Sequence, residues 1–369
     1  MKLISSEFYK LFVKRRFAVV LILLIVFDTV SFCVSLENRI DLDANSVEVY
    51  KTYINEYSGE LTHEKIRLIE AEIDERYLNE SLKGELERQF ASNEITVEEY
   101  KSESAILKEK VKGTDGFNRF INAYYDALDN GQYLADSTVW DVLYGNGGID
   151  FTMVIVIILM IIALTVYDEE IGINRLKFSA KNGKSQLISV QISVSCLLSI
   201  LIPVLIFAGR FFIAKVFFGL NGFENPLNTA KIFEFTQWNL SLLSAYVYLS
   251  IIKIAGYVYL AFMTMIIGQV LKSSLYTMFI SLVSIYVPAY VLSTVWERYL
   301  VPIPSSLLTA VGYFSATEYG SLDVAENGEI IINTFSIEQL QVFFSVVLVT
   351  IVAMIITNHI LWTKRQSFK

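Results

Sequence analysis

The sequence has few of the residues that build metal sites and disulfide bonds. Among 369 residues there are two cysteines and two histidines. Cys33 and Cys196 both lie in apolar stretches, as buried thiols do, so they define no disulfide framework. His63 and His359 are far apart, and no His, Cys and carboxylate cluster has metal-ligand spacing. The sequence therefore predicts no metal site and no disulfide-stabilised secreted domain.

A complete phosphate-binding loop is also missing. Residues 182–185 (NGKS) resemble the end of such a loop, but Phe178 stands where its first glycine would be. Without that glycine the backbone cannot cradle a phosphate. The sequence has no Gly-x-Ser-x-Gly elbow and suggests no Ser–His–Asp or Cys–His arrangement. We therefore expect this chain to bind no cofactor and to be no enzyme in its own right.

Glycine and proline are scarce as well, whereas apolar residues make up 54% of the chain and the mean hydropathy is +0.47. A helix needs about 20 apolar residues to cross a bilayer. Six segments approach or exceed that length: 17–36, 151–167, 187–208, 240–271, 273–295 and 340–363. The first is too long for a secretory signal and no cleavage site follows it, so we expect it to be retained. The predicted fold class is an all-α integral membrane protein with six transmembrane helices.

Charge is distributed unevenly along the chain. Residues 36–149 carry 12 Lys and Arg against 24 Asp and Glu, a net charge of −12, while the rest carries +4. This is not the basic patch of a nucleic-acid-binding protein. Basic residues concentrate in cytoplasmic loops, so we place both termini inside: 13 basic residues then lie in cytoplasmic segments. Four lie in short outer loops: Arg210, Lys215, Lys231 and Arg298.

This orientation divides the chain into alternating segments. Residues 1–16 and 364–369 are the cytoplasmic ends, 168–186 is a cytoplasmic loop, and 296–339 is an extracellular loop. Residues 37–150 form an acidic extracellular domain between the first and second spans. Ile66, Ile69, Ile73 and Tyr77 recur there at helical spacing. We expect two or three helices between about 45 and 130, one of them starting at a capping box in residues 96–99 (TVEE).

Aromatic residues are frequent between this domain and the second span. They are Tyr124, Tyr125, Tyr133, Trp140 and Tyr144. Such rings anchor helices at membrane interfaces, so we predict that they lie at the outer surface of the membrane. Stacking on a ligand is the alternative function.

A second apolar segment, 302–314, is too short to cross the membrane. Two prolines, Pro302 and Pro304, lead into the sequence SSLLTAVGYF. Short apolar runs of this kind form re-entrant or interfacial helices.

Two ionisable residues fall inside predicted spans: Asp28 near the middle of the first and Lys253 near the middle of the fourth. A charge in hydrocarbon is costly unless it is paired or hydrated. One hypothesis is that the two side chains form an ion pair. The other is that Lys253 extends toward the interface and Asp28 bonds nearby backbone.

The loop 168–186 contains both acidic and basic residues and is amphipathic. It is either a solvated loop or a docking helix whose charges select a cytoplasmic partner.

From this loop a family resemblance extends over most of the chain. Residues 167–172 (YDEEIG), followed by Leu176, Ser179 and Gly183, resemble ABC transporter permeases of the type-2 exporter family. Residues 6–11 (SEFYKL) with 14–16 (KRR) are similar to the amphipathic connecting helix before the first span of these permeases. Residues 57–65 (YSGELTHEK) resemble the extracellular insert of Gram-positive members. The large insert and Lys253 depart from the minimal pattern.

The resemblance implies roles for particular residues. Coupling to an ATPase falls to Glu169, Glu170, Ile171, Gly172, Arg175, Leu176 and Lys177. The connecting helix includes Glu7, Phe8, Lys10 and Leu11, and the outer gate includes Pro302, Pro304, Leu307 and Leu308. Asp28 and Lys253 would line the translocation path.

The function expected from the resemblance is export of peptides or amphiphiles such as bacteriocins, or immunity to them, across a bacterial plasma membrane. The partners would be a cytoplasmic ABC ATPase dimer holding ATP and Mg²⁺, a second permease, identical or different, and membrane lipid. The alternative is a sensor or structural membrane protein whose outer domain binds a ligand or envelope component and signals inward.

Overall fold

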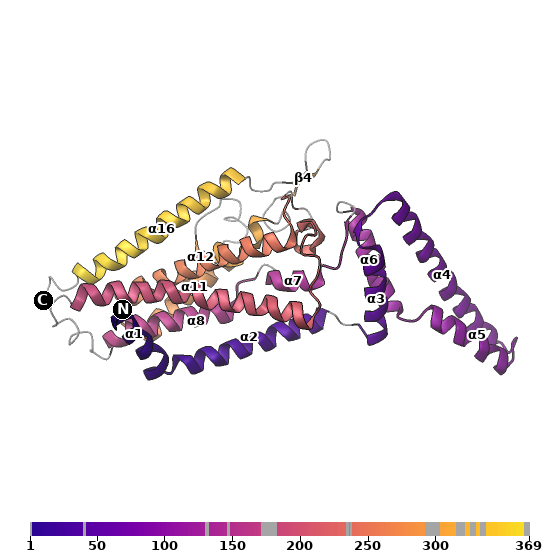
Figure 1. Cartoon of the computed structure of the whole chain (residues 1–369), viewed down its shortest axis with the longest axis horizontal. Coiled ribbons are helices and arrows are strands. Elements are labelled where there is room, and N and C mark those ends of the chain that lie inside the picture. The colour runs from indigo at the N-terminus through magenta and orange to yellow at the C-terminus, as the bar shows by residue number, and fades with distance from the viewer. Residues whose placement is uncertain are drawn as a thin grey trace.

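The computed structural model describes residues 2–39, 42–129, 133–145, 148–170, 183–233, 236, 238–291, 303–314, 322–324, 330–332 and 337–364. The described chain is predominantly helical, and long helices form a bundle from one end of which a helical insert projects (Figure 1). Both termini lie at the opposite end of the bundle. The all-α fold class is confirmed.

Five helices in the described residues are long and apolar enough to cross a membrane. They are α2 (Phe17–Arg39), the continuous helix α8–η3–α9 (Phe151–Ile161, Ile162–Val166, Tyr167–Glu170), α11 (Gly183–Phe217), α12 (Leu242–Leu271) and α16 (Ile337–Lys364). The apolar stretch Ser274–Tyr290 of α13 (Ser274–Val291) is shorter than the others. The architecture is therefore that of a multi-pass membrane protein, with five of the six predicted spans matched by helices of sufficient length.

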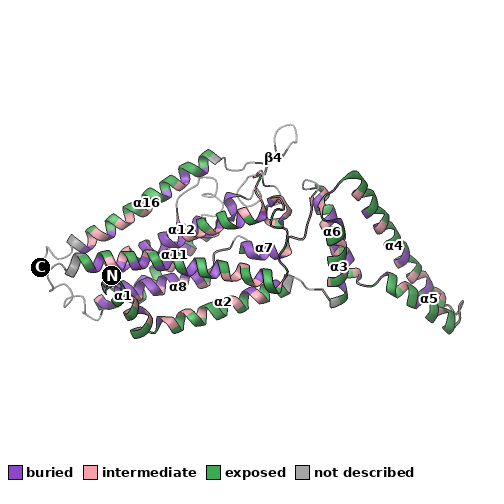
Figure 2. Ribbon diagram, viewed as in Figure 1, coloured by how far each residue is buried: buried purple, intermediate pink, exposed green. Residues whose placement is uncertain are grey.

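The helix α12 is the centre of the bundle and packs against α8, α11, α13 and α16. Its buried residues run almost continuously from Gly256 to Phe262, so most sides of the helix are covered there. By contrast, α2 and α16 expose apolar side chains along much of their length (Figure 2). Exposed apolar helix faces of this kind are suited to contact with lipid.

The described residues between about 45 and 130 form four helices, so the prediction of two or three was wrong. They are α3 (Ala44–Tyr57), α4 (His63–Ala91), α5 (Val97–Lys110) and α6 (Thr114–Asp129). The α3–α6 pair lies next to the bundle, and the α4–α5 pair projects away from it (Figure 1). A short antiparallel pair, β1 (Gly59–Glu60) with β2 (Tyr133–Leu134), joins the segment after α3 to the segment after α6.

Local sequence signals in the insert were read correctly. The capping box is present, with the Thr96 amide donating to the Glu99 carboxylate at 2.9 Å and the Glu99 amide to the Thr96 hydroxyl at 3.3 Å. Ile69 and Ile73 are buried in a core shared by α3, α4 and α6, whereas Tyr77 remains 52% exposed. Helical spacing therefore identified the buried face but extended it one turn too far.

The predicted interfacial position is wrong for three of the aromatic residues. Tyr124 is buried in the core of the insert, and Trp140 and Tyr144 are buried on the short helix α7 (Thr138–Tyr144) within the bundle core. The Trp140 indole N–H donates to the Asn221 carbonyl at 2.7 Å, and the Tyr144 hydroxyl donates to the Leu242 carbonyl at 2.7 Å. These two rings therefore connect α7 to neighbouring segments instead of meeting a membrane surface.

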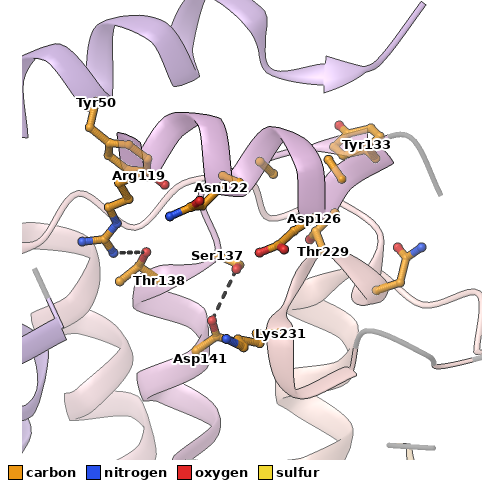
Figure 3. Close-up of a pocket in the computed structure, with 14 residues that line it drawn as sticks. Tyr50, Arg119, Asn122, Asp126, Tyr133, Ser137, Thr138, Asp141, Thr229 and Lys231 are labelled. Carbon is orange, nitrogen blue, oxygen red and sulfur yellow. Dashed lines mark hydrogen bonds between the residues drawn. The ribbon is translucent and has the colours of Figure 1, made fainter. Parts of the chain in front are cut away.

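The insert meets the bundle through α6 and α7. The Arg119 guanidinium of α6 donates to the Thr138 hydroxyl of α7 at 2.7 Å and lies over the Tyr50 ring of α3, 5.0 Å from its centroid (Figure 3). A guanidinium can use its planar face and its N–H groups at the same time. One side chain thus joins two helices of the insert to the bundle.

The backbones of α3 and α6 approach each other closely at Gly116. A Cβ atom on Gly116 would overlap the Ser46 carbonyl oxygen, which is backbone and cannot rotate away. We predict that Gly116→Ala separates α3 from α6 and costs at least about 2 kcal/mol of stability, as overpacking does. Thermal unfolding of the purified protein measures the loss.

Gly84→Ala on α4 is the matched control, since a Cβ there meets nothing within 4 Å. We expect it to be neutral or to stabilise by about 0.5–1 kcal/mol, because alanine favours a helix interior. Equal losses for the two variants would contradict the packing described for α3 and α6.

Candidate functional site

A buried ion cluster joins three helices inside the bundle. Arg210 of α11 donates to the Asp28 carboxylate of α2 through Nε, at 3.0 Å, and through Nη2. The same Nη2 donates to Asp150, which stands at the start of α8. The side chain of Asp28 is only 7% exposed. One cation is therefore shared by two carboxylates at a depth where isolated charges are costly.

The cluster corrects two parts of the sequence analysis. Arg210 was predicted in an outer loop after a span ending at residue 208, but α11 continues to Phe217. Asp28 was considered a partner for Lys253, yet its ion-pair partner is Arg210. A planar guanidinium can donate to two carboxylates at once, which an ammonium does less well. This explains why Arg210, and not Lys253, is the ion-pair partner of Asp28.

Asp150 has a second role at the beginning of α8. Its carboxylate accepts a hydrogen bond from the Met153 amide at 3.1 Å and so caps the helix. A carboxylate is stabilised at a helix N-terminus, where backbone N–H groups are free. Arg210 thereby holds the first turn of α8 against α11.

Lys253 of α12 lies beside this cluster and lines a cavity of about 140 Å³. Asp150, Arg210, Tyr144 and Tyr246 line the same cavity. Lys253 makes no ion pair or hydrogen bond that we see within the described ranges, although its ammonium approaches the backbone at Gly145, where α7 ends. The structure thus places both sequence-predicted intramembrane charges near one another without pairing them.

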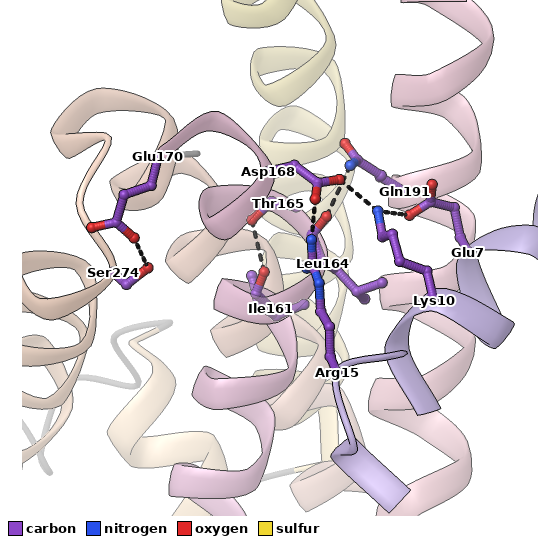
Figure 4. Close-up of polar contacts among 10 residues, drawn as sticks. All are labelled: Glu7, Lys10, Arg15, Ile161, Leu164, Thr165, Asp168, Glu170, Gln191 and Ser274. Carbon is purple, nitrogen blue, oxygen red and sulfur yellow. Dashed lines mark hydrogen bonds and ion pairs between the residues drawn. The ribbon is translucent and has the colours of Figure 1, made fainter. Parts of the chain in front are cut away.

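A second ion cluster fastens the N-terminal helix at the other end of the bundle. This helix consists of α1 (Lys2–Tyr9) and the π-helical turn η1 (Lys10–Lys14). Lys10 donates to the Asp168 carboxylate at 2.6 Å, and Arg15 donates to its other oxygen (Figure 4). Asp168 is 1% exposed and belongs to α9, at the end of the second long apolar helix. We call Lys10, Arg15 and Asp168 the Asp168 clasp.

Neighbouring residues support the Asp168 clasp. Glu7 forms an ion pair with Lys10, and Leu11 is fully buried against the bundle. The Arg15 guanidinium lies 4.7 Å from the centroid of the Tyr167 ring. Burial lowers the pKa of Lys10, while the carboxylates of Asp168 and Glu7 act to raise it. The predicted connecting-helix residues Glu7, Lys10 and Leu11 therefore lie together, but Asp168 was missed as their partner.

The predicted coupling residues are only partly described. Glu169 and Glu170 end the helix α9, and Glu170 accepts a hydrogen bond from the Ser274 hydroxyl at 2.5 Å, at the start of α13 (Figure 4). Ile171, Gly172, Arg175, Leu176 and Lys177 lie outside the described residues. The end of α9 is thus connected both to the N-terminal helix and to α13.

The predicted re-entrant segment is a short buried helix, α15 (Pro304–Thr309), followed by the 3₁₀ turn η6 (Val311–Tyr313). Leu307 and Leu308 are fully buried, and a Cβ on Gly256 would lie 2.9 Å from the Leu307 Cβ. Gly256 is at the middle of α12, so α15 reaches the central part of the bundle. Pro302 lies outside the described residues, and a role of Pro304, Leu307 and Leu308 in gating stays a prediction.

No family model, no curated protein and no solved structure matches this chain. Within the described ranges, no group of three or more His, Cys, Asp or Glu side chains could hold a metal ion. The functional interpretation therefore depends on the two ion clusters, the buried segment α15 and the cavities of this structure.

Arg210 provides a direct test of the intramembrane cluster. Arg210→Gln leaves the buried Asp28 carboxylate and the partly buried Asp150 carboxylate without their cation, so we predict a loss of about 3–5 kcal/mol, as for other broken buried ion pairs. Thermal unfolding in detergent measures it. The triple variant Arg210→Gln/Asp28→Asn/Asp150→Asn removes the stranded charges and should recover most of the stability.

Lys215→Gln serves as the control, because Lys215 is exposed on the same helix. Its removal should change stability by less than about 1 kcal/mol. A loss in Lys215→Gln equal to that in Arg210→Gln would contradict the importance of the cluster.

Proposed function

We propose that this chain is the transmembrane subunit of an ATP-driven exporter, energised by a separate ATPase that docks on the end of the bundle carrying both termini. The observation that carries the proposal is the Asp168 clasp. Lys10 and Arg15 hold Asp168 near Glu170, the last described residue of the second long apolar helix, just before residues 171–182 of the proposed docking loop. A partner acting on that loop would move the N-terminal helix and α8–η3–α9 together.

The Asp168 clasp is suited to transmitting force because it connects the N-terminal helix directly to α9. Asp168 is buried and bonded through both carboxylate oxygens. Only Arg16, which has a positive φ of 54°, lies between Arg15 and the start of α2. Motion of the loop would therefore reach α2 and, through Asp28 and Arg210, also α11.

The proposed topology has six spans, with α13 as the fifth in sequence. An even number of spans places both termini on one side of a membrane, and both termini lie at the same end of the bundle (Figure 1). The proposed orientation puts this end in the cytoplasm, following the basic residues of its short loops. The insert would then lie outside the cell, and a second permease would complete the transporter.

The intramembrane charges and α15 support a transport path through the bundle. Asp28, Arg210 and Asp150 offer polar groups beside the cavity that Lys253 lines. The short buried helix α15 is flanked by non-helical backbone at Ile303 and Ala310, and such backbone is tolerated at membrane depth where it is buried in protein. We propose peptides or amphiphiles as the cargo of this path, on the resemblance to bacterial exporters.

A ligand sensor is the second candidate function. The observation in its favour is the set of cavities between the insert and the bundle, which border Tyr50, Arg119 and Thr138. A sensor would not need a stoichiometrically bound ATPase partner. Co-purification from native membranes in detergent therefore separates the two functions.

The acidic pair at the end of α9 tests ATPase coupling. Glu169→Lys/Glu170→Lys reverses both charges at the start of the proposed docking loop. We predict that this variant inserts normally but loses co-purification of the ATPase by at least about tenfold, since like charges now oppose the partner's groove. ATP-dependent transport should be lost in parallel.

Glu75→Lys/Glu87→Lys, with both positions exposed on α4 of the insert, is the matched control. It makes the same change of charge at the other end of the molecule and should retain the ATPase. Full transport activity and undiminished ATPase recovery in Glu169→Lys/Glu170→Lys would refute the proposed coupling.

A further inference from the structure

The junction between the insert and the bundle is loosely packed. It contains three neighbouring cavities of about 310, 360 and 410 Å³. Cavities of this size at a boundary between two parts of a protein are common places for small ligands. Figure 3 shows the first, which is bounded by the insert on one side and by the bundle on the other.

Three separate segments supply polar groups to this cavity. From the insert, α6 contributes Asn122 and Asp126, which are four residues apart and therefore share one helix face. The start of α7 contributes Ser137. The 3₁₀ turn η5 (Lys231–Phe233), which lies between α11 and α12, contributes Lys231.

Part of the cavity wall is held in place by internal bonds. Arg119 is engaged by the Thr138 hydroxyl and the Tyr50 ring, as described above. The Ser137 hydroxyl donates to Asp141 at 3.4 Å. These bonds fix the position of α6 relative to α7, so the cavity has a defined shape before any ligand arrives.

The other two charged side chains of the cavity are not engaged in this way. Asp126 and Lys231 each line it, and among the described residues neither makes a hydrogen bond or an ion pair that we observe. They carry opposite charges and come from opposite sides of the junction, as Figure 3 shows. Both side chains are exposed, so the cavity of about 310 Å³ presents a carboxylate and an ammonium that a ligand can reach.

We propose that this cavity binds a small zwitterion of the size of an amino acid or a dipeptide. The ammonium of the ligand would donate to the Asp126 carboxylate and the Asn122 amide oxygen. Its carboxylate would accept from the Lys231 ammonium. Charge-assisted hydrogen bonds at both ends select a molecule with two opposite charges over one that has only one.

Binding would have a structural consequence. A bound zwitterion connects α6 of the insert to η5, which lies between the long helices α11 and α12. The ligand would thereby stiffen the junction where the insert meets the bundle. The inference depends only on the residues of this cavity and holds for either candidate function.

The test uses three related probes with the purified full chain in detergent. Glycylglycine carries both charges, N-acetylglycylglycine only the carboxylate, and glycylglycinamide only the ammonium. We expect glycylglycine to bind at least about tenfold more tightly than either of the others, since each charged end contributes to affinity. Titration calorimetry gives the three dissociation constants.

Two single variants should each abolish recognition of one charged end of glycylglycine. With Asp126→Asn, glycylglycine should bind no more tightly than N-acetylglycylglycine. With Lys231→Gln, it should bind no more tightly than glycylglycinamide. Glu103→Gln and Lys108→Gln on α5, both exposed and remote from the cavity lining, should leave all three constants unchanged.

Three outcomes overturn the proposal. Equal affinities for the three probes would show that paired charges are not recognised. The absence of saturable binding of glycylglycine would exclude the proposed ligand class. Loss of binding in the α5 variants to the same extent as in Asp126→Asn would place any binding elsewhere on the insert.

Discussion

The ion pairs of Arg210 are the interaction on which the bundle depends. The carboxylate of Asp28 is buried on α2 and that of Asp150 is partly buried at the start of α8, and each would be destabilising without a cation. Arg210 satisfies both and so fixes α2, α8 and α11 relative to one another. A pair of helices joined only by apolar contacts could slide at low cost, whereas a shared guanidinium specifies one arrangement.

At the end of the bundle that carries the termini, the Asp168 carboxylate is likewise shared by two groups of opposite charge. Asp168 is contacted by Lys10 and Arg15, which precede α2 in the chain. Asp28 lies on α2, so this helix links the two ion clusters. The chain of contacts from Asp168 through Arg15 and α2 to Asp28 and Arg210 is continuous. These contacts link Asp168 to Arg210, which lines a cavity together with Tyr144 of α7, and they are the route along which we propose that motion is transmitted.

Much of the fold could be predicted from the sequence, because membrane-spanning helices need long apolar runs and helix starts favour capping residues. Both features can be recognised from neighbouring residues alone. Long apolar runs marked the helices, and the Thr96–Glu99 capping box marked the start of α5. The site could be predicted only in part. Asp28 was visible as a charge in an apolar run, but Arg210 was assigned to a loop, since its burial depends on carboxylates far away in sequence. Trp140 and Tyr144 were misplaced because an interfacial ring and a core ring have the same local sequence pattern.

The central claim is that motion at the end carrying the termini is transmitted along the bundle to the insert. Spin labels on Val34 of α2 and Val342 of α16, both exposed near the insert end, report the separation of these helices. The measurement is their distance distribution in a reconstituted complex with the proposed ATPase partner, with and without a non-hydrolysable ATP analogue. The account predicts a shift of the distribution on nucleotide binding. An unchanged distribution, in a complex shown to bind the nucleotide, would contradict it.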